Sequence, residues 1–304
     1  MSWETFTRRL VRSLFEATRE TSFSADIAYT NGRQGGLNRY YVYTREYHRH
    51  GYELTHSEES INDSPIIKSR DTAIIIHGHQ GSAFETLNPV VKDAFLIAYD
   101  LNVIVVDWSI FAKQSYRNAV IAVSSVGLEL ANLVNSLVKA ERVELDRLHI
   151  VGFNLGAHVA GFTGRGLRGE VARITGLDPS KGQWESNSNR LTHTDALYVE
   201  VIHTDGEGFK SNGLGTPIGH TDFYPNGGSN QPACLFSNSC SHNRAWEMFA
   251  ATLIHDHLTA NRCANTLQLW TNSCHGYTLN MGNNAYVKMG SGIFRVNTKR
   301  TFPF

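Results

Sequence analysis

Residues 150–157 read IVGFNLGA, and this stretch has the pattern of a tight turn between a strand and a helix. The apolar run Leu148–Gly152 predicts a buried strand, and the small residues of AHVAGF directly after the turn are typical of a helix. Between them, Gly152 and Gly156 flank Asn154 as glycines flank the reactive residue of a strand–turn–helix elbow, where a serine normally stands. A carboxamide nitrogen is not a usable nucleophile, because its lone pair is shared with its own carbonyl group. The stretch therefore predicts the turn and lacks the hydroxyl that the turn usually presents.

The elements around this turn alternate. Short apolar runs predict strands, and longer segments with apolar residues at helical spacing predict helices. The predicted strands are Thr72–His77, Asn102–Asp107, Leu148–Gly152, Ile174–Leu177 and Ala196–His203, and the predicted helices are Val120–Ala140 and residues 245–258. Strands that alternate with helices predict a mostly parallel sheet that is covered on both faces.

The rest of the chain suits one large α/β domain over residues 1–304, because no long linker interrupts it. Residues 1–37 predict an N-terminal extension with an amphipathic helix, or a mature chain with an added start methionine, and they lack the compact apolar core of a secretory signal. Residues 206–240 are rich in glycine and asparagine and predict long surface loops. The last thirty residues predict strands or turns at the edge of the sheet.

Charge excludes two classes of partner. Lysine plus arginine equals aspartate plus glutamate, 28 each, so no net field attracts nucleic acid or an anionic membrane. No run of eighteen apolar residues predicts a transmembrane helix.

The cysteines lie late in the chain, at Cys234, Cys240, Cys263 and Cys274. Their spacing suits two local disulfides better than a zinc site, which usually has paired CxxC motifs or interleaved histidines. The alternative is four reduced core cysteines in a cytosolic protein. The polar, turn-rich segments around them favour disulfides and an extracellular location.

Three residues are candidates for the site, because reactive groups in open α/β sheets lie beyond the carboxyl ends of the strands. Asn154 follows one predicted strand, Asp178 follows the next in ITGLDPS, and His242 lies at the start of the last helix. This is the chain order of an α/β-hydrolase triad. Taken singly, Asp178 also suits a turn or helix cap, and His242 is one of 14 histidines.

The chain order of an α/β-hydrolase also predicts two main-chain donors for an oxyanion. One is the N–H of His79, which follows a predicted strand, and the other is the N–H of Leu155, directly after the elbow position. Neither donor depends on the missing serine. Asparagine also tolerates the positive φ of an elbow best among non-glycine residues, and its NH₂ group could donate to His242 as a serine hydroxyl would.

Nine stretches resemble the pancreatic lipase family, and within it the insect-type neutral lipases, phospholipases A1 and yolk proteins. They are RYYVYTRE, AIIIHGHQGS, NVIVVDWS, HIVGFNLGAHVAGFTGR, ITGLDPS, YVEVIHTD, GHTDFYPNGG, QPAC and CSHNRAWE, in family order from about residue 38 to the end. The resemblance implies an α/β-hydrolase fold, with the triad acid at Asp178, the triad histidine at His242 and oxyanion donors at His79 and Leu155. It also implies that Cys234–Cys240 brackets the lid and that Cys263–Cys274 is a second disulfide.

The sequence departs from this family in several places. Asn154 replaces the serine, His79 replaces an aromatic residue at the oxyanion position, and the lid LFSNS is as short as in phospholipases. The chain stops where many members add a β-sandwich lipid-binding domain. Thr192 replaces a usual carboxylate in the calcium loop Arg190–Asp195, which leaves at most a weak calcium site at Asp195; no other metal and no cofactor is expected.

Three functions fit this degenerate triad. In the first, the His242–Asp178 pair acts as a general base in lyase- or cyclase-type chemistry. In the second, a pseudoenzyme binds or stores a lipid-like ligand, as yolk proteins do. In the third, the chain is an inactivated variant of a carboxylic ester hydrolase of lipase or phospholipase A1 type. The retained acid and histidine favour a base, because a binding protein needs neither, but they also fit recent inheritance by a binding protein, so both functions stay open. Each function predicts an apolar small-molecule partner, held in a groove between residues 206–230 and the lid, with transient contact to a lipid surface.

Overall fold

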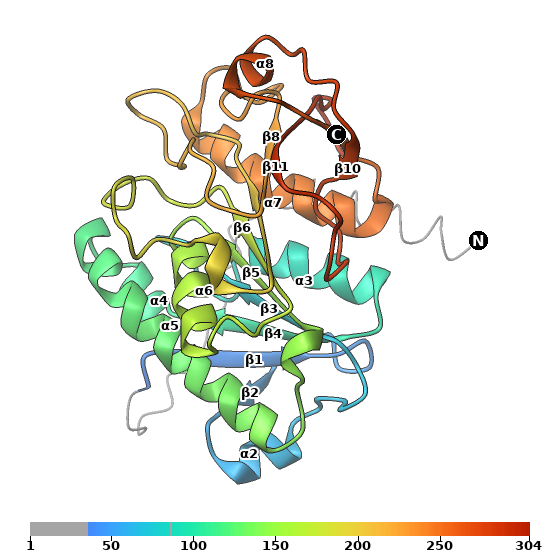
Figure 1. Ribbon diagram of the computed structural model, residues 1–304. Coiled ribbons are helices and arrows are strands. Elements are labelled where there is room, and N and C mark those ends of the chain that lie inside the picture. The colour runs from blue at the N-terminus through green and yellow to red at the C-terminus, as the bar shows by residue number, and fades with distance from the viewer. Residues whose placement is uncertain (1–35, 86) are drawn as a thin grey trace.

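The computed structural model describes residues 36–85 and 87–304 (Figure 1). In chain order its elements are β1 (Arg39–Tyr43), β2 (Tyr52–Leu54), α2 (Glu58–Asp63), β3 (Thr72–Ile76), α3 (Leu87–Ala98), β4 (Asn102–Asp107), α4 (Ser109–Ala112), α5 (Tyr116–Lys139), η1 (Leu145–Arg147), β5 (Leu148–Phe153), α6 (Leu155–Gly166), β6 (Arg173–Leu177), η2 (His193–Asp195), β7 (Tyr198–Ile202), β8 (Thr221–Pro225), α7 (Asn238–His255), β9 (Thr259–Arg262), α8 (Thr266–Trp270), β10 (Thr278–Asn280) and β11 (Gly292–Val296).

One sheet contains all the strands of the described residues, in the order β10-β9-β11-β8-β7-β6-β5-β3-β4-β1-β2. Every neighbouring pair from β11 through β8, β7, β6, β5 and β3 to β4 is parallel, and antiparallel pairs lie at both edges. The predicted mostly parallel sheet with flanking helices is confirmed. The expectation of strands at the edge near the C-terminus also agrees with β9, β10 and β11.

Both faces of the sheet are buried, which explains why its central strands are continuous apolar runs. In β3, Ile74 and Ile76 point into the core beneath α5 and α6, while Ala73 and Ile75 point into the core beneath α3 and α7. Figure 1 shows these helix pairs on opposite sides of the sheet. Because successive side chains of a strand alternate between its faces, both faces of β3 carry apolar side chains, and its one polar residue, Thr72, lies at its start.

The predicted central strands are confirmed to within about two residues at either end. The helix predicted at residues 245–258 is corrected, since α7 begins at Asn238 rather than Ala245 and ends at His255. Ser237 caps it by accepting a hydrogen bond from the Cys240 N–H, and Asp256 ends it in a left-handed conformation. His242 therefore lies one turn inside the helix, where the backbone holds it rigidly.

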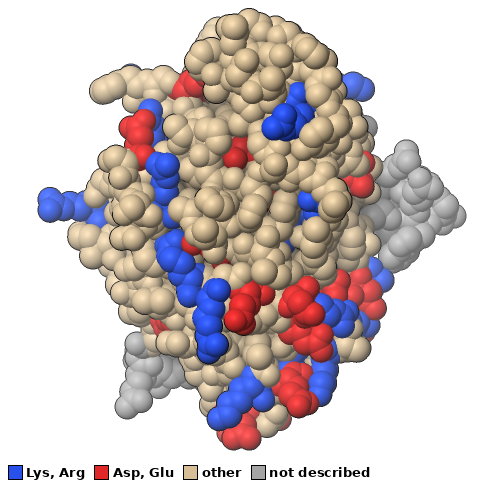
Figure 2. Space-filling model, viewed as in Figure 1, with Lys and Arg blue, Asp and Glu red and all other residues tan. Residues whose placement is uncertain are grey.

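Helix α5 is long and apolar enough, by length and composition, to cross a membrane. It is a core helix of this fold, because Leu130, Leu133, Val134 and Leu137 are completely buried against the sheet and α6. Acidic and basic side chains are mixed over the lower part of the face in Figure 2, and the upper part is mostly uncharged. The predicted N-terminal helix falls within residues 1–35, outside the described residues, and the assignment of residues 1–304 to one domain stays a prediction.

Candidate functional site

The elbow at Asn154 forms as the two glycines predict. Asn154 lies between β5 and α6 with φ 55° and ψ −118°. A Cβ atom on Gly152 would lie 2.2 Å from the Gly156 carbonyl oxygen, and one on Gly156 would lie 2.4 Å from the Ile76 carbonyl oxygen. Any larger residue at either position would push the helix away from the strands, so the turn requires both glycines.

Asn154, Asp178 and His242 come together at the carboxyl end of the sheet. His242 Nδ1 lies 2.5 Å from Asp178 Oδ2, and His242 Nε2 lies 2.9 Å from Asn154 Nδ2. An ionised carboxylate only accepts hydrogen bonds, so Nδ1 carries the ring proton and Nε2 presents its lone pair to the Asn154 NH₂ group. The histidine thus has the tautomer and orientation of a general base.

The environment of Asp178 holds its carboxylate in place. Asp178 is completely buried, and its Oδ1 accepts hydrogen bonds from the backbone N–H groups of Thr204 at 2.7 Å and Asp205 at 3.1 Å. A Cβ atom on Gly213 would lie 2.3 Å from Asp178 Oδ2. The segments at Thr204–Asp205 and at Gly213 therefore enclose the Asp178 carboxylate and fix the direction from which it accepts the hydrogen bond of His242.

The expected oxyanion donor at His79 is already engaged. Its backbone N–H donates to Asn154 Oδ1 at 3.1 Å. The donor at His79 does not depend on the serine, as expected, but the asparagine that replaces the serine fills it. Leu155, which carries the other expected donor, is the first residue of α6 and is completely buried.

The Asn154 carboxamide therefore bridges the two groups that acyl chemistry would use. Its nitrogen donates to the lone pair of the base, and its oxygen accepts from an oxyanion donor. A ligand carbonyl could reach the His79 N–H only by displacing Asn154 Oδ1. Asn154 therefore replaces the nucleophile and also bonds to His242 and to the His79 N–H, the two groups that would act with a nucleophile.

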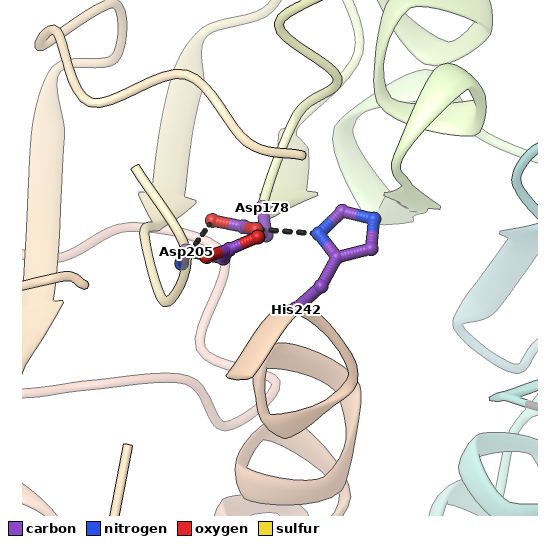
Figure 3. A group of neighbouring side chains, drawn as sticks. All are labelled: Asp178, Asp205 and His242. Carbon is purple, nitrogen blue, oxygen red and sulfur yellow. Dashed lines mark hydrogen bonds and ion pairs between the residues drawn. The ribbon is translucent and has the colours of Figure 1, made fainter. Parts of the chain in front are cut away.

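A second carboxylate, Asp205, lies beside the pair and was missed by the sequence reasoning (Figure 3). Its Oδ1 accepts from Asn238 Nδ2 at 2.7 Å, and its Oδ2 accepts from the N–H and Nδ2 of Asn212, both at 2.8 Å. Burial raises the pKa of Asp205, and the nearby Asp178 carboxylate raises it further. Its place directly after the strand in YVEVIHTD was the available signal.

Ligand atoms of Asp178, Asp205 and His242 lie within 4.8 Å of one another, which is close enough to hold a metal ion. The oxygens of Asp178 and Asp205 already accept hydrogen bonds from His242, from backbone N–H groups and from the asparagines described above. These contacts account for the cluster without a cation. Asp205 therefore links the start of α7 and the 206–213 loop to Asp178.

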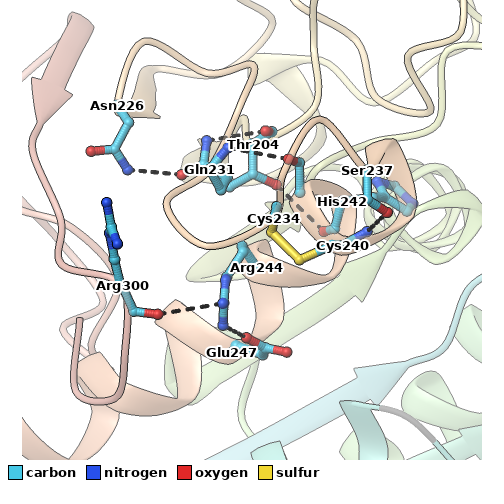
Figure 4. Close-up of a disulfide and its surroundings, with 11 residues drawn as sticks. Thr204, Asn226, Gln231, Cys234, Ser237, Cys240, His242, Arg244, Glu247 and Arg300 are labelled. Atoms are coloured by element: carbon cyan, nitrogen blue, oxygen red, sulfur yellow. Dashed lines mark hydrogen bonds and ion pairs between the residues drawn. A yellow bond between two sulfur atoms is a disulfide. The ribbon is translucent and has the colours of Figure 1, made fainter.

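Both predicted disulfides are present. Cys234–Cys240 joins Cα atoms 5.4 Å apart and closes the lid loop beside the helix that carries His242 (Figure 4), and Cys263–Cys274 joins Cα atoms 4.4 Å apart. Gln231 Nε2 anchors the base of this loop by donating to the carbonyl oxygens of Thr204 and Pro225. The lid tip is apolar and open to solvent, since Leu235 is 89% and Phe236 85% exposed.

The loop with the suspected calcium site is closed by a guanidinium. Arg165 Nη1 donates to both oxygens of Asp195 at 2.7 and 2.8 Å, and Arg165 Nη2 donates to the Asn189 carbonyl at 2.8 Å. Thr192 contributes its backbone N–H to the same carboxylate. Any calcium ion at Asp195 would have to compete with the positive charge of Arg165.

Removing this guanidinium should destabilise the protein. In Arg165→Ala the almost completely buried Asp195 loses its cationic partner, and we expect a loss of about 2 kcal/mol, less than for a fully buried pair because Arg165 is partly exposed. Urea unfolding measures this change, and Lys113→Ala, which removes an exposed ion pair with Glu85, is the control. If calcium can use this loop, it should stabilise Arg165→Ala more than the parent. Equal urea midpoints for parent, Arg165→Ala and control would contradict the assignment.

The described residues also form a polar pocket. It is lined by Glu207, Asn226, Gly227, Ser229, Trp270 and Arg295, and no residue of the Asn154 site lines it. The predicted apolar groove over Asn154 therefore stays a prediction. Three exposed apolar side chains lie on the segments that were expected to border it, Leu235 and Phe236 on the lid and Phe209 on the 206–213 loop.

Comparison with known proteins matches almost the whole chain to one family. The family model described as Lipase matches residues 13–302. The chain is 36% identical over 227 residues to pancreatic lipase-related protein 2 from Cavia porcellus, which covers 71% of this chain and 51% of the relative. It is 36% identical over 212 residues to phospholipase A1 member A from Rattus norvegicus (66% and 45%), and 35% identical over 217 residues to pancreatic triacylglycerol lipase from Myocastor coypus (69% and 48%). The chain spans about half the length of these curated relatives.

Proposed function

The chain belongs to the lipase family and has an α/β-hydrolase fold, and from this premise we propose that it binds an apolar, acyl-chain ligand without cleaving acyl esters. The observation that carries the proposal is the double engagement of the Asn154 carboxamide, at 2.9 Å from His242 Nε2 and 3.1 Å from the His79 backbone nitrogen. Acyl transfer requires a nucleophile that gives its proton to the base and an oxyanion donor that the substrate carbonyl can reach. At this site a carboxamide replaces the nucleophile and also fills the His79 donor.

The ligand class follows from the family and from the surface beside the site. The relatives are called lipases or phospholipase A1, which supports a lipid-like ligand for this chain. Phe209, Leu235 and Phe236 are exposed on the 206–213 loop and the lid, the segments that were expected to border the site, and exposed apolar side chains favour contact with an apolar molecule or a lipid surface. The two disulfides support an extracellular, secreted protein.

A second candidate is the repurposed base. The 2.5 Å contact between His242 and the completely buried Asp178 favours it, because a pure binding protein has no need of an oriented imidazole. In this case Asn154 would have to rotate away from Nε2 when a substrate with an acidic C–H or O–H group enters. Lyase- or cyclase-type chemistry would then depend on His242 and not on any acyl intermediate.

A series of fatty acids of increasing chain length tests the binding proposal. Each buried methylene contributes about 0.8 kcal/mol, so affinity measured by calorimetry should rise about fourfold per carbon until the site is filled. Phe236→Ser should weaken binding of the longer members, whereas Phe84→Ser, on the β3–α3 loop, serves as an exposed-phenylalanine control. The unmodified protein should show no ester turnover above background. Affinity that is independent of chain length would reject the proposal, and conversion of a substrate that is lost in His242→Ala would favour the base.

A further inference from the structure

We propose that Asn154 is a self-modification site, at which the His242–Asp178 pair hydrolyses the Asn154 carboxamide and leaves a carboxylate at the elbow. Hydrolysis of an amide needs a donor on the carbonyl oxygen, an acid beside the leaving nitrogen and a base for the attacking water. Among the described residues, the carbonyl group that lies between His242 and the His79 N–H is that of Asn154 itself.

The contacts match those needs at both ends of the amide. Oδ1 accepts from the His79 N–H at 3.1 Å, where negative charge would develop during attack. Nδ2 lies 2.9 Å from His242 Nε2, so the same ring nitrogen that removes a proton from water can return it to the leaving nitrogen. The Asp178 carboxylate, 2.5 Å from Nδ1, stabilises the imidazolium between these two transfers.

The step balances with water as the only co-reactant. His242 Nε2 removes a proton from a water molecule, and the water oxygen bonds to Cγ of Asn154 while the carbonyl electrons move to Oδ1. When the carbonyl re-forms, the Cγ–Nδ2 bond breaks, and His242 gives its proton to Nδ2, which leaves as ammonia. The carboxylic acid that remains then gives its proton to His242 Nε2, which leaves a carboxylate beside an imidazolium. Water can approach from the solvent side, because Asn154 and His242 each keep 8% of their surface exposed while Asp178 keeps none.

Hydrolysis would change what the elbow can do. A carboxylate is a nucleophile, and a carboxamide is not, so the modified side chain could form an ester with an electrophilic carbon. It could no longer donate to His242 Nε2 and would instead form an ion pair with the protonated ring. The encoded chain would then be a precursor of the form that carries a reactive residue. This inference does not depend on which ligand the protein binds.

Ordinary deamidation offers a reference within the same molecule. In that reaction the next backbone nitrogen attacks Cγ, and the cyclic imide opens to a mixture of aspartate and isoaspartate. It is fastest before glycine, as at Asn212–Gly213 and Asn226–Gly227. Asn154 precedes Leu155, whose backbone is fixed at the start of α6. Direct hydrolysis at Asn154 yields aspartate only and requires His242.

The experiment follows residue 154 by peptide mass spectrometry. Folded protein is incubated in ¹⁸O-labelled water and then digested with trypsin, which releases residues 148–165, a peptide with Asn154 as its only side-chain amide. The parent should accumulate aspartate with one ¹⁸O atom and no isoaspartate at this position. His242→Ala and the more conservative His242→Gln should convert at least about a hundredfold more slowly, the lower limit for loss of general acid–base catalysis. Asn226 should convert equally in all three proteins.

Three results would overturn the proposal. They are a peptide that keeps its asparagine while Asn226 converts, conversion of Asn154 at the same rate in the parent and both His242 variants, and isoaspartate at residue 154. Because product chemistry in the parent is a readout of its own, the test holds even if one His242 variant does not fold. Binding of fatty acids is measured separately, so failure here leaves the binding proposal to its own test.

Discussion

Replacing Asn154 with serine should give a protein that hydrolyses a short-chain ester at least about 10³-fold faster than the encoded chain, since loss of a triad serine costs about 10⁶ in kcat in other hydrolases. The substitution places a hydroxyl near His242 Nε2, which already accepts a hydrogen bond from Asn154 Nδ2 at 2.9 Å. It also removes the Asn154 carbonyl oxygen that accepts from the His79 N–H. Serine is smaller than asparagine, so the elbow with φ 55° should accept it at little cost in stability.

Two variants separate the possible causes of such a gain. Asn154→Ala vacates the oxyanion donor without adding a nucleophile, and it should stay inactive. Asn154→Ser/His242→Ala adds the hydroxyl without its base, and it should neither turn over the ester nor react with an active-site phosphonate. Labelling of Asn154→Ser alone would identify a lipase site that lacks only its nucleophile. No labelling in any variant would show that the geometry around residue 154 does not support acyl chemistry.

Glu200→Gln should lower the free energy of unfolding by about 3–5 kcal/mol, as expected when one partner of a buried ion cluster is removed. Glu200 Oε1 lies 3.0 Å from Arg173 Nη2, and Glu200 Oε2 lies 2.6 Å from Lys288 Nζ. Arg173 and Glu200 are completely buried and Lys288 almost so. Without the carboxylate, two buried cations would face each other with only neutral acceptors between them.

The protonation of Lys288 supports this expectation. Burial lowers the pKa of Lys288 to about 8, although the Glu200 carboxylate raises it. Its charge is therefore already costly in the folded state and would cost more without Glu200. Urea unfolding at neutral pH measures the loss, and Glu141→Gln, which removes the exposed partner of Lys68, is the matched control, for which a far smaller change is expected. Similar losses in both variants would mean that the cluster contributes no more than a surface pair.

Local sequence was sufficient for the backbone of the site. The β-branched runs before His77 and Phe153 predict buried strands because both faces of the sheet are covered, and Gly152 and Gly156 predict the elbow because only glycine permits its close approach. The two disulfides followed from short spacing and family resemblance. The start of α7 was misplaced, since the Ser237 cap lies inside a polar segment that reads as loop.

The identities of Asn154, Asp178 and His242 predicted which groups meet, since the carboxyl ends of parallel strands share one edge. Local patterns were therefore enough to predict the sheet, the turn and the replacement of the usual serine by Asn154. Packing of the folded chain sets how the Asn154 amide is used, places Asp205 beside the lid side of the site, and brings the charge of Arg165 to Asp195. These contacts join residues 30 to 88 positions apart in side-chain directions that no local pattern encodes. A hydrogen bond depends on tenths of an ångström between such groups, and packing of the whole fold sets those distances.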